Sequence, residues 1–313
     1  MAQANVGQKV VLVVGATGRL GTKICKALLD RGAHVRALVR ATSDRSRLQA
    51  IGVTDFAVGD MMDPASLGAA FARIPVADAV IASAAGYTRH SKGDGPETDR
   101  VGYRNLVDAA KAANIARFVL ISILECDHAR DVPHFHDKYL IEQYLAEKGQ
   151  PYIALRPGAF LDQSQDFITP GLQKGEFRAF VPHVPFGMVY TPDLARYAAA
   201  AVVELPDTFL NGPIDIGWDK AYSSQEIAAG FSRVLNRPIE EKPGIPPLLR
   251  RVVFPVVAMF AEPAKDMLAM IRWIEAGHYV SRNTARQKQA FGDLPTIDDV
   301  ARRFSIEHGL LTK

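Results

Sequence analysis

The chain has 313 residues, of which 48% are apolar and 23% charged, and its formal net charge is only +3. This composition supports a large buried core, and without a block of like charges it argues against nucleic-acid binding. Two cysteines, Cys25 and Cys126, are too few for a disulfide framework or a cysteine zinc site. The chain begins without a signal-peptide pattern, and Pro255 interrupts the later apolar run at 252–261. We therefore expect a soluble cytoplasmic protein with no membrane or nucleic-acid partner.

The first half of the sequence alternates short apolar runs with helical patterns. The runs predict strands over 9–15, 34–40, 55–60, 78–85, 117–122 and 152–158. Between them the spacing of apolar residues predicts helices from Leu20 to a stop at Gly32, and over 63–72, 98–114 and 134–148. Strands alternating with helices indicate an α/β fold, a Rossmann-type parallel sheet wound on both faces.

Beyond residue 157 this alternation ends, and proline and glycine become frequent. The sequence there predicts strands at 177–181 and 213–217, and helices at 191–204, 224–236, twice between 246 and 276, and within 293–309. We expect a dinucleotide-binding domain over 1–157, with helix 191–204 packing on it. Residues 158–313 would then form a smaller α+β region on the substrate side.

The stretch GATGRLG at 15–21 lies between a predicted strand and a predicted helix, the setting in which a glycine pattern predicts a phosphate site. Gly15 permits a tight turn, Gly18 lets the backbone approach a pyrophosphate, and Gly21 lets helix and strand pack closely. An anion would be held by free N–H groups at the helix start. The alternative is a glycine-rich turn without a ligand. The predicted contacts are Gly15, Thr17, Gly18, Arg19, Leu20 and Gly21.

The GxxGxxG spacing resembles the atypical branch of the short-chain dehydrogenase/reductase superfamily. The likeness is greatest to its NmrA-like, NAD(P)H-binding group, which includes isoflavone-reductase-like enzymes. It is dense over the first half, through GDMMDPASL (59–67), VIASAAG (80–86), NLVDAAKAANIARFVLIS (105–122) and LRPGAF (155–160), and looser through 190–202 and 223–239.

The resemblance implies further cofactor contacts. Asp60 would face the adenine with Met61 beside it, unless Asp60 is only a turn residue before the helix cap at Asp63. The backbone after the fourth strand would pass near the ribose and pyrophosphate, and LRPGAF would complete the site. The residues implied in this way are Ala82, Ser83, Ala84, Pro157 and Phe160.

Arg40, at the end of the second strand, indicates the type of nicotinamide cofactor. An NAD site usually places an acidic residue there for the ribose hydroxyls. A guanidinium suits a 2′-phosphate instead, and Ser43, Arg45 and Arg47 follow closely. We therefore expect NADP, with NADPH preferred over NADH. Two alternatives stay open: Asp44 could hold a ribose, and the arginines could belong to a solvated loop.

The stretch HFHDKYL at 134–140 carries the expected catalytic residues. Short-chain dehydrogenases use a serine at the end of strand five and a YxxxK pair on the next helix. Ser122 matches the serine and Lys138 the lysine, which the resemblance implies would also hold the nicotinamide ribose. His134 stands where the tyrosine would be. NmrA-like proteins typically keep this lysine and place a glutamate one turn later, here Glu142. The Lys138–Glu142 spacing would equally suit a surface ion pair.

His134 could replace the tyrosine as proton donor, because histidine titrates near neutrality. It could also be a histidine that caps the helix or faces solvent, and Tyr87 and Tyr139 are other candidate donors. Histidines and aspartates cluster around 127–137, but without a metal-ligand spacing, so no metal is expected.

Two functions from different classes remain. The first is an NADPH-dependent reductase of a small apolar carbonyl, enone or quinone-like substrate. The second is a regulator that binds NAD(P) and a partner protein without turnover, which the missing tyrosine favours. Residues 244–276 would form a substrate lid or a surface for a protein partner or a second copy. The substrate walls, or simply core, would be Phe160, Phe167, Phe180 and Phe186.

Overall fold

The computed structural model describes residues 8–86, 95–179, 181–244, 246, 249 and 253–312, without the side chains of 163–167 and 254. Tyr87 and Phe180, and the side chain of Phe167, therefore lie outside the described residues. The chain divides into two compact units. The first comprises Met1–Ile123, His134–Arg156 and Thr191–Ile214, and the second Leu124–Pro133, Pro157–Tyr190 and Asp215–Lys313.

A seven-stranded sheet, in the order β10-β6-β5-β4-β1-β2-β3, is the centre of the first unit. Every strand pair with a resolved register is parallel, and Val14 at the end of β1 pairs with Ala82 at the end of β4. The strand order reverses between β1 and β4, which confirms the Rossmann-type α/β prediction. The strands are β1 (Val10–Val14), β2 (His34–Val39), β3 (Asp55–Val58), β4 (Ala79–Ala82), β5 (Arg117–Ile121), β6 (Tyr152–Pro157) and β10 (Gly212–Ile216).

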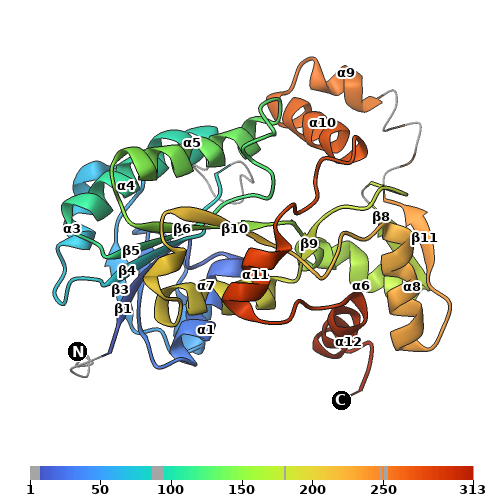
Figure 1. The fold of residues 1–313 in the computed structure, drawn as a ribbon, viewed down its shortest axis with the longest axis horizontal. Coiled ribbons are helices and arrows are strands. Elements are labelled where there is room, and N and C mark those ends of the chain that lie inside the picture. The colour runs from blue at the N-terminus through green and yellow to red at the C-terminus, as the bar shows by residue number, and fades with distance from the viewer. Residues whose placement is uncertain are drawn as a thin grey trace. The chain divides into compact units, whose positions relative to one another are not determined.

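Helices cover both faces of this sheet (Figure 1). On one face, α1 (Arg19–Leu29) packs against α7 (Thr191–Val203). On the other lie α3 (Pro64–Phe71), α4 (Tyr103–Ala112) and α5 (Pro133–Glu147). The central strands β1, β4 and β5 are buried along their whole length, which explains why they are continuous apolar runs. A short helix, α2 (Ser46–Ala50), and a 3-10 turn, η3 (Asp207–Phe209), complete the unit.

Two helices of the first unit begin in different ways. Asp63 caps α3 by accepting a hydrogen bond from the Ala65 N–H, as predicted. The helix predicted over 98–114 instead opens with a π-helical turn, η1 (Thr98–Gly102), before α4 begins. Gly102 packs closely there, since a Cβ on it would lie 3.1 Å from the Met61 Cβ.

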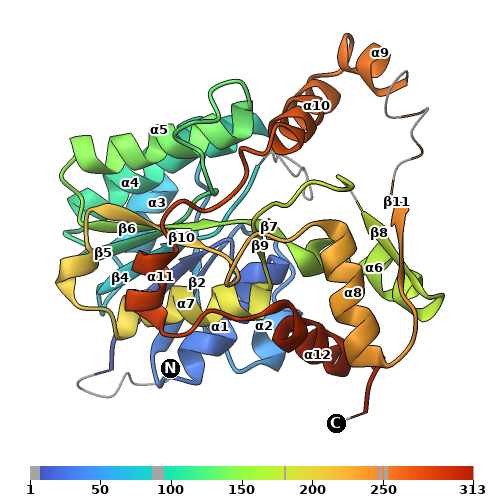
Figure 2. The ribbon, with the colours of Figure 1, turned by 45° about the vertical axis from the view of Figure 1, so that its right-hand side comes forward.

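The second unit contains two small parallel sheets and several helices (Figure 2). The helix α6 was not predicted, because Pro170 and Gly171 inside it suggested a loop. The elements α11 and β11 were also missed. The strands are β7 (Ala159–Phe160), β8 (Glu176–Ala179), β9 (Met188–Val189) and β11 (Glu240–Pro243), and the helices are η2 (Leu161–Ser164), α6 (Gln165–Gln173), α8 (Ser224–Leu235), α9 (Phe254–Ala258), α10 (Glu262–Glu275), α11 (Thr284–Phe291) and α12 (Ile297–Glu307).

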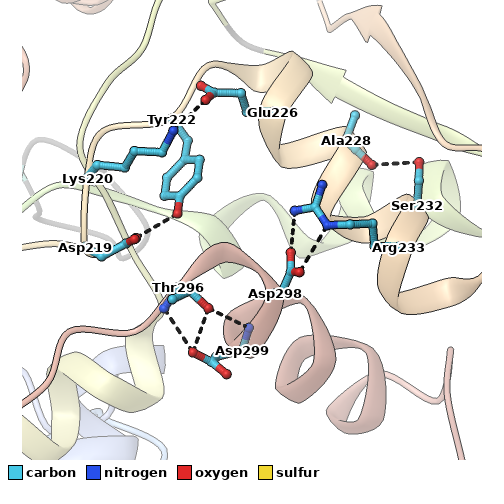
Figure 3. A network of polar contacts seen from close by, with 10 residues as sticks. All are labelled: Asp219, Lys220, Tyr222, Glu226, Ala228, Ser232, Arg233, Thr296, Asp298 and Asp299. Carbon is cyan, nitrogen blue, oxygen red and sulfur yellow. Dashed lines mark hydrogen bonds and ion pairs between the residues drawn. The ribbon is translucent and has the colours of Figure 1, made fainter.

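The helices α8 and α12 pack together through a glycine and an ion pair. Figure 3 shows the ion pair, between Arg233 and Asp298. A Cβ on Gly230 would lie 2.5 Å from Ile297 Cγ1, so only glycine fits at this crossing. Beside it, Arg233 donates two hydrogen bonds to the Asp298 carboxylate. Both helices begin with a capping box, which satisfies their first amides.

A buried charge network joins β2 to β3 in the first unit. Arg36 is only 2% exposed, and its Nε lies 2.8 Å from Asp55 Oδ2, which also receives His34 Nε2 at 2.9 Å. The Arg36 Nη1 donates to the main-chain oxygens of Arg73 and Pro75. Burial opposes the charge on Asp55, but the hydrogen bonds from His34 and Arg36 outweigh it and lower the pKa of that carboxyl.

Replacing Asp55 with asparagine should lower the free energy of unfolding at pH 7 by about 3 kcal/mol, because Arg36 would keep a buried charge without its counterion. Since the pKa of Asp55 is lowered on folding, its contribution is present above the unfolded value of about 3.9 and is lost as pH falls through the folded value. Urea unfolding of wild type and Asp55→Asn at pH 7 and in acid tests this.

The control is Asp30→Asn, which breaks the exposed Lys26–Asp30 pair and should change stability by less than about 0.5 kcal/mol. If Asp55→Asn lowered the free energy of unfolding equally at pH 7 and in acid, the Asp55 charge would not be the source of this stability.

Candidate functional site

At its glycine positions, the loop after β1 leaves no room for a side chain. Gly15 has φ +78°, and a Cβ on it would lie 2.7 Å from the Ala84 N atom. A Cβ on Gly21 would lie 2.0 Å from the Gly15 carbonyl oxygen, and one on Gly18 3.2 Å from the same oxygen. Gly18 occupies the N-cap of α1, so no side chain caps this helix at the switch point of the sheet.

The end of β4 lies directly beside this loop. Ser83 donates two hydrogen bonds to the Val14 carbonyl oxygen, from its N–H and its Oγ, each 3.0 Å long. The predicted contacts Ala82, Ser83 and Ala84 therefore share one backbone surface with Gly15. The structure brings together these two parts of the predicted cofactor site.

The loop after β2 presents the predicted basic residues. The Arg40 N–H donates to Ser43 Oγ at 3.1 Å, so the predicted pair forms one turn. The Asp44 carboxylate accepts from both the N–H and the Oγ of Ser46, and these hydrogen bonds lower its pKa. Arg45 lies over the Phe56 ring at 5.3 Å. The Asp44 carboxylate is thus held within its own turn.

Asp60 and Met61 lie just beyond β3. The Asp60 carboxylate accepts from the Met62 N–H at 2.9 Å, and its own N–H donates to Ser66 Oγ. Asp60 therefore has the role of a turn residue, in addition to any contact with a ligand. Met61 is buried and packs close to Gly102.

Lys138 is buried in a polar cluster rather than offered to solvent. Its Nζ lies 3.1 Å from Asp99 Oδ1, 3.8 Å from the centre of the Tyr103 ring, and donates to the Ala84 carbonyl oxygen at 3.3 Å. Burial opposes the ammonium charge, but Tyr103 and Asp99 outweigh it and raise the pKa of Lys138. Lys138 is therefore a permanently charged group beside the end of β4.

Ser122 and Glu142 belong to a second buried cluster. The Ser122 Oγ donates to Glu142 Oε1 at 2.6 Å, and Arg156 donates to both oxygens of Glu142 at 3.0 and 2.7 Å. Glu142 is 2% exposed. The alternative of a surface Lys138–Glu142 ion pair is therefore wrong, because each side chain is buried with its own partner of opposite charge.

His134 lies in the first turn of α5, one turn before Lys138. Its side chain is only 6% exposed and meets the Phe135 ring edge-on, with 4.7 Å between centroids, so the alternative of a solvent-facing histidine is wrong. Nearby, Arg100 forms two 3.0 Å hydrogen bonds with Asp137. Burial raises the pKa of Asp137 in spite of this partner. Tyr139 is half-buried, with its ring beside that of His136.

Pro157 and Phe160, the remaining predicted contacts, belong to the second unit. The Pro157 carbonyl oxygen accepts from the Leu124 N–H at 3.0 Å and from the Tyr279 hydroxyl at 3.4 Å. Phe160 is half-buried and Phe186 is buried.

The histidines and aspartates around 127–137 do not gather at one point. His128 lies near the carboxylates of Glu125 and Asp127 in the second unit, whereas His134 and His136 belong to the first. Within the described ranges, no group of three metal-ligating side chains could hold an ion.

Two residues of the Lys138 cluster, Asp99 and Tyr103, were missed from the sequence. A signal existed, because Asp99 falls on the same helical stripe as Tyr103, Leu106 and Ala110, all of which are buried. A carboxylate on an apolar stripe needs a buried cation, and Lys138 is that cation.

A doubly wound parallel sheet with a bare glycine loop at its switch point defines the Rossmann-like class of folds. Within that class the chain belongs to the NmrA-like family, whose pattern matches residues 7–297.

Two relatives illustrate the range of the family. A photosystem II assembly factor, Ycf39 of Cyanophora paradoxa, is 30% identical over 62% of this chain and 59% of its own length. An NAD(P)H azoreductase of Xenophilus azovorans is 27% identical over 74% of this chain and 75% of its own length. The chain thus spans about three fifths of the length of that assembly factor.

Solved structures share the fold at lower identity. The NADPH complex of a quinone oxidoreductase from Escherichia coli has a TM-score of 0.72, with 19% identity over 94% of this chain and 99% of that one. A triphenylmethane reductase from Citrobacter sp., complexed with NADP(H), has a TM-score of 0.73 and 21% identity over the same shares. Among the described helices, none is long and apolar enough to cross a membrane.

Gly21→Ala should lower the free energy of unfolding by more than about 2 kcal/mol, because the new methyl group would collide with the rigid Gly15 carbonyl. The matched control is Gly68→Ala, also in a helix, where nothing lies within 4 Å of the new Cβ. That substitution should stabilise the protein by about 0.5–1 kcal/mol. Urea unfolding of both variants checks this, and equal effects would show that Gly21 is not sterically required.

Proposed function

We propose that the first unit binds NADP(H) and that the protein is an NADPH-dependent oxidoreductase acting on a small apolar carbonyl, enone or quinone-like substrate. The observation that carries this proposal is the glycine loop at the switch point. No side chain caps the start of α1 there, and the first amides of a helix favour a phosphate. Relatives named as an azoreductase and a quinone oxidoreductase support the same reaction class.

The residues present fit such a cofactor. The loop 15–21 would hold the pyrophosphate, because glycines at 15 and 21 allow a close backbone packing that a Cβ at either position would disrupt. Arg40 and Ser43 would hold a 2′-phosphate, and the engagement of Asp44 by Ser46 supports NADP over NAD. Residues 60–61 and 82–84 would border the adenosine. When bound, the nicotinamide supplies the hydride.

The protein's own contribution to the chemistry would be charge and a proton. The Lys138 ammonium gives the end of β4 a fixed positive charge, although Asp99 neutralises much of it. Ser122 is bound to Glu142 and serves to orient that cluster. His134, one turn before Lys138, is the proposed proton donor in place of the tyrosine.

A second function is favoured by the state of Lys138. A buried lysine paired with Asp99 and Tyr103 is suited to fixing structure, and with no tyrosine at 134 the site could bind the cofactor without turnover. The protein would then act as an NAD(P)(H)-responsive regulator. The relatives named as photosystem II assembly factors are compatible with such a partner-binding role.

If the protein is a reductase, purified wild type should oxidise NADPH in the presence of at least one member of a panel of quinones, enones and aldehydes. His134→Phe should lower kcat by about a hundredfold while leaving NADPH binding intact, because only the proton donor is removed. The control, His183→Phe, changes an exposed histidine and should have wild-type activity. Tight NADPH binding with no turnover on any acceptor would favour the regulator.

Arg40→Ala should weaken NADPH binding by about tenfold or more, since a charge-assisted contact to the 2′-phosphate is lost. NADH binding should be unchanged. Titration of both cofactors by nucleotide fluorescence measures this, with Arg31→Ala as control because Arg31 pairs with Glu204 at the other end of α1. Equal weakening of both cofactors would remove Arg40 as the specificity residue.

A further inference from the structure

The segment that follows β4, residues 84–86, is held by three buried side chains from other elements. Tyr103 from α4 donates its hydroxyl to the Ala84 carbonyl oxygen at 2.5 Å, and Lys138 from α5 donates to the same oxygen at 3.3 Å. Asp99 from η1 accepts a hydrogen bond from the Gly86 N–H at 2.8 Å. The segment's polar groups are thus bound by a cluster contributed by the following helices.

The three side chains of the cluster contact one another and are almost completely buried. Asp99 is 1% exposed, Tyr103 0% and Lys138 3%, so each charge depends on the other for compensation. The ammonium also lies 3.8 Å from the centre of the Tyr103 ring, a favourable cation–π contact. Removing Asp99 or Lys138 alone would leave the other charge buried without its counterion.

The same segment is confined from two sides. A Cβ on Gly86 would lie 2.2 Å from the Gly95 carbonyl oxygen and 2.6 Å from the Thr98 Cβ, so the chain is pressed against the start of η1. On the other side, the Ala84 N atom would be 2.7 Å from a Cβ on Gly15. A shift of residues 84–86 would therefore alter the space beside the glycine loop.

We propose that Asp99 and Tyr103 are positioning residues for dinucleotide binding: together with Lys138 they clamp residues 84–86 against Gly15 and so keep the glycine loop in its binding geometry. This inference rests on the proposed NADP(H) binding. It assigns the lysine a structural task in the site and extends the site to Asp99, a residue that the glycine pattern does not include.

The test compares Asp99→Asn and Tyr103→Phe with Asp55→Asn. Asp55 is the matched control, since it is also a buried aspartate paired with a cation in the first unit but belongs to the network at the start of β3. Tyr103→Phe keeps the ring and removes only the hydroxyl, so it serves if Asp99→Asn folds poorly. Each variant is titrated with NADPH and with NADH below its melting temperature, and hydrogen exchange is followed in a peptide covering 83–86.

Asp99→Asn and Tyr103→Phe should each weaken NADPH binding roughly tenfold and speed exchange at 83–86, whereas Asp55→Asn should lose stability with affinity changed by less than about twofold. The double variant Asp99→Asn/Tyr103→Phe should be less than additive in affinity, because both substitutions release the same segment.

Two results would overturn the clamp: wild-type affinity in Asp99→Asn, or the same loss of affinity in all three single variants. Failure of the wild type to bind either cofactor would instead refute the proposed function on which the clamp rests.

Discussion

The close approach of Gly15 to Ala84 is the constraint on which the first unit depends. Parallel pairing of β1 with β4 places Val14 beside Ala82, and the next residues of both strands must then pass each other with no side chain between them. Glycine at 15 allows both the positive φ and the contact. Since the strand order reverses between β1 and β4, this contact lies at the switch point of the sheet.

The buried charged side chains of helix α5 each pair with a side chain of opposite charge from another element. Helix α5 carries His134, Lys138 and Glu142 at successive intervals of four residues, and all three are buried. Such a stripe would ordinarily face water, yet here each charged member has a partner from another element, Asp99 for Lys138 and Arg156 for Glu142. Replacing one partner alone would cost more stability than replacing both with apolar residues.

The sequence was sufficient where the signal is local. Buried parallel strands, the cap at Asp63 and the glycine loop are all encoded within a few residues, so the sheet and the position of the loop could be predicted. The environments of Lys138 and Glu142 could not, because their partners come from elements 39 residues before and 14 residues after them in the chain. The prediction missed helix α6 for the opposite reason. Pro170 is a strong local signal against a helix, and tertiary structure overrode it.

The division of the chain has a consequence for its synthesis. The first unit is built from three separate stretches, and the last of them, Thr191–Ile214, supplies helix α7 and most of strand β10. Until residue 214 has left the ribosome, the apolar side of α1 is uncovered and β6 is an open sheet edge. By then residues 157–190 of the second unit have already emerged. The nascent chain at this stage therefore exposes apolar surface and a strand edge, two features that favour aggregation.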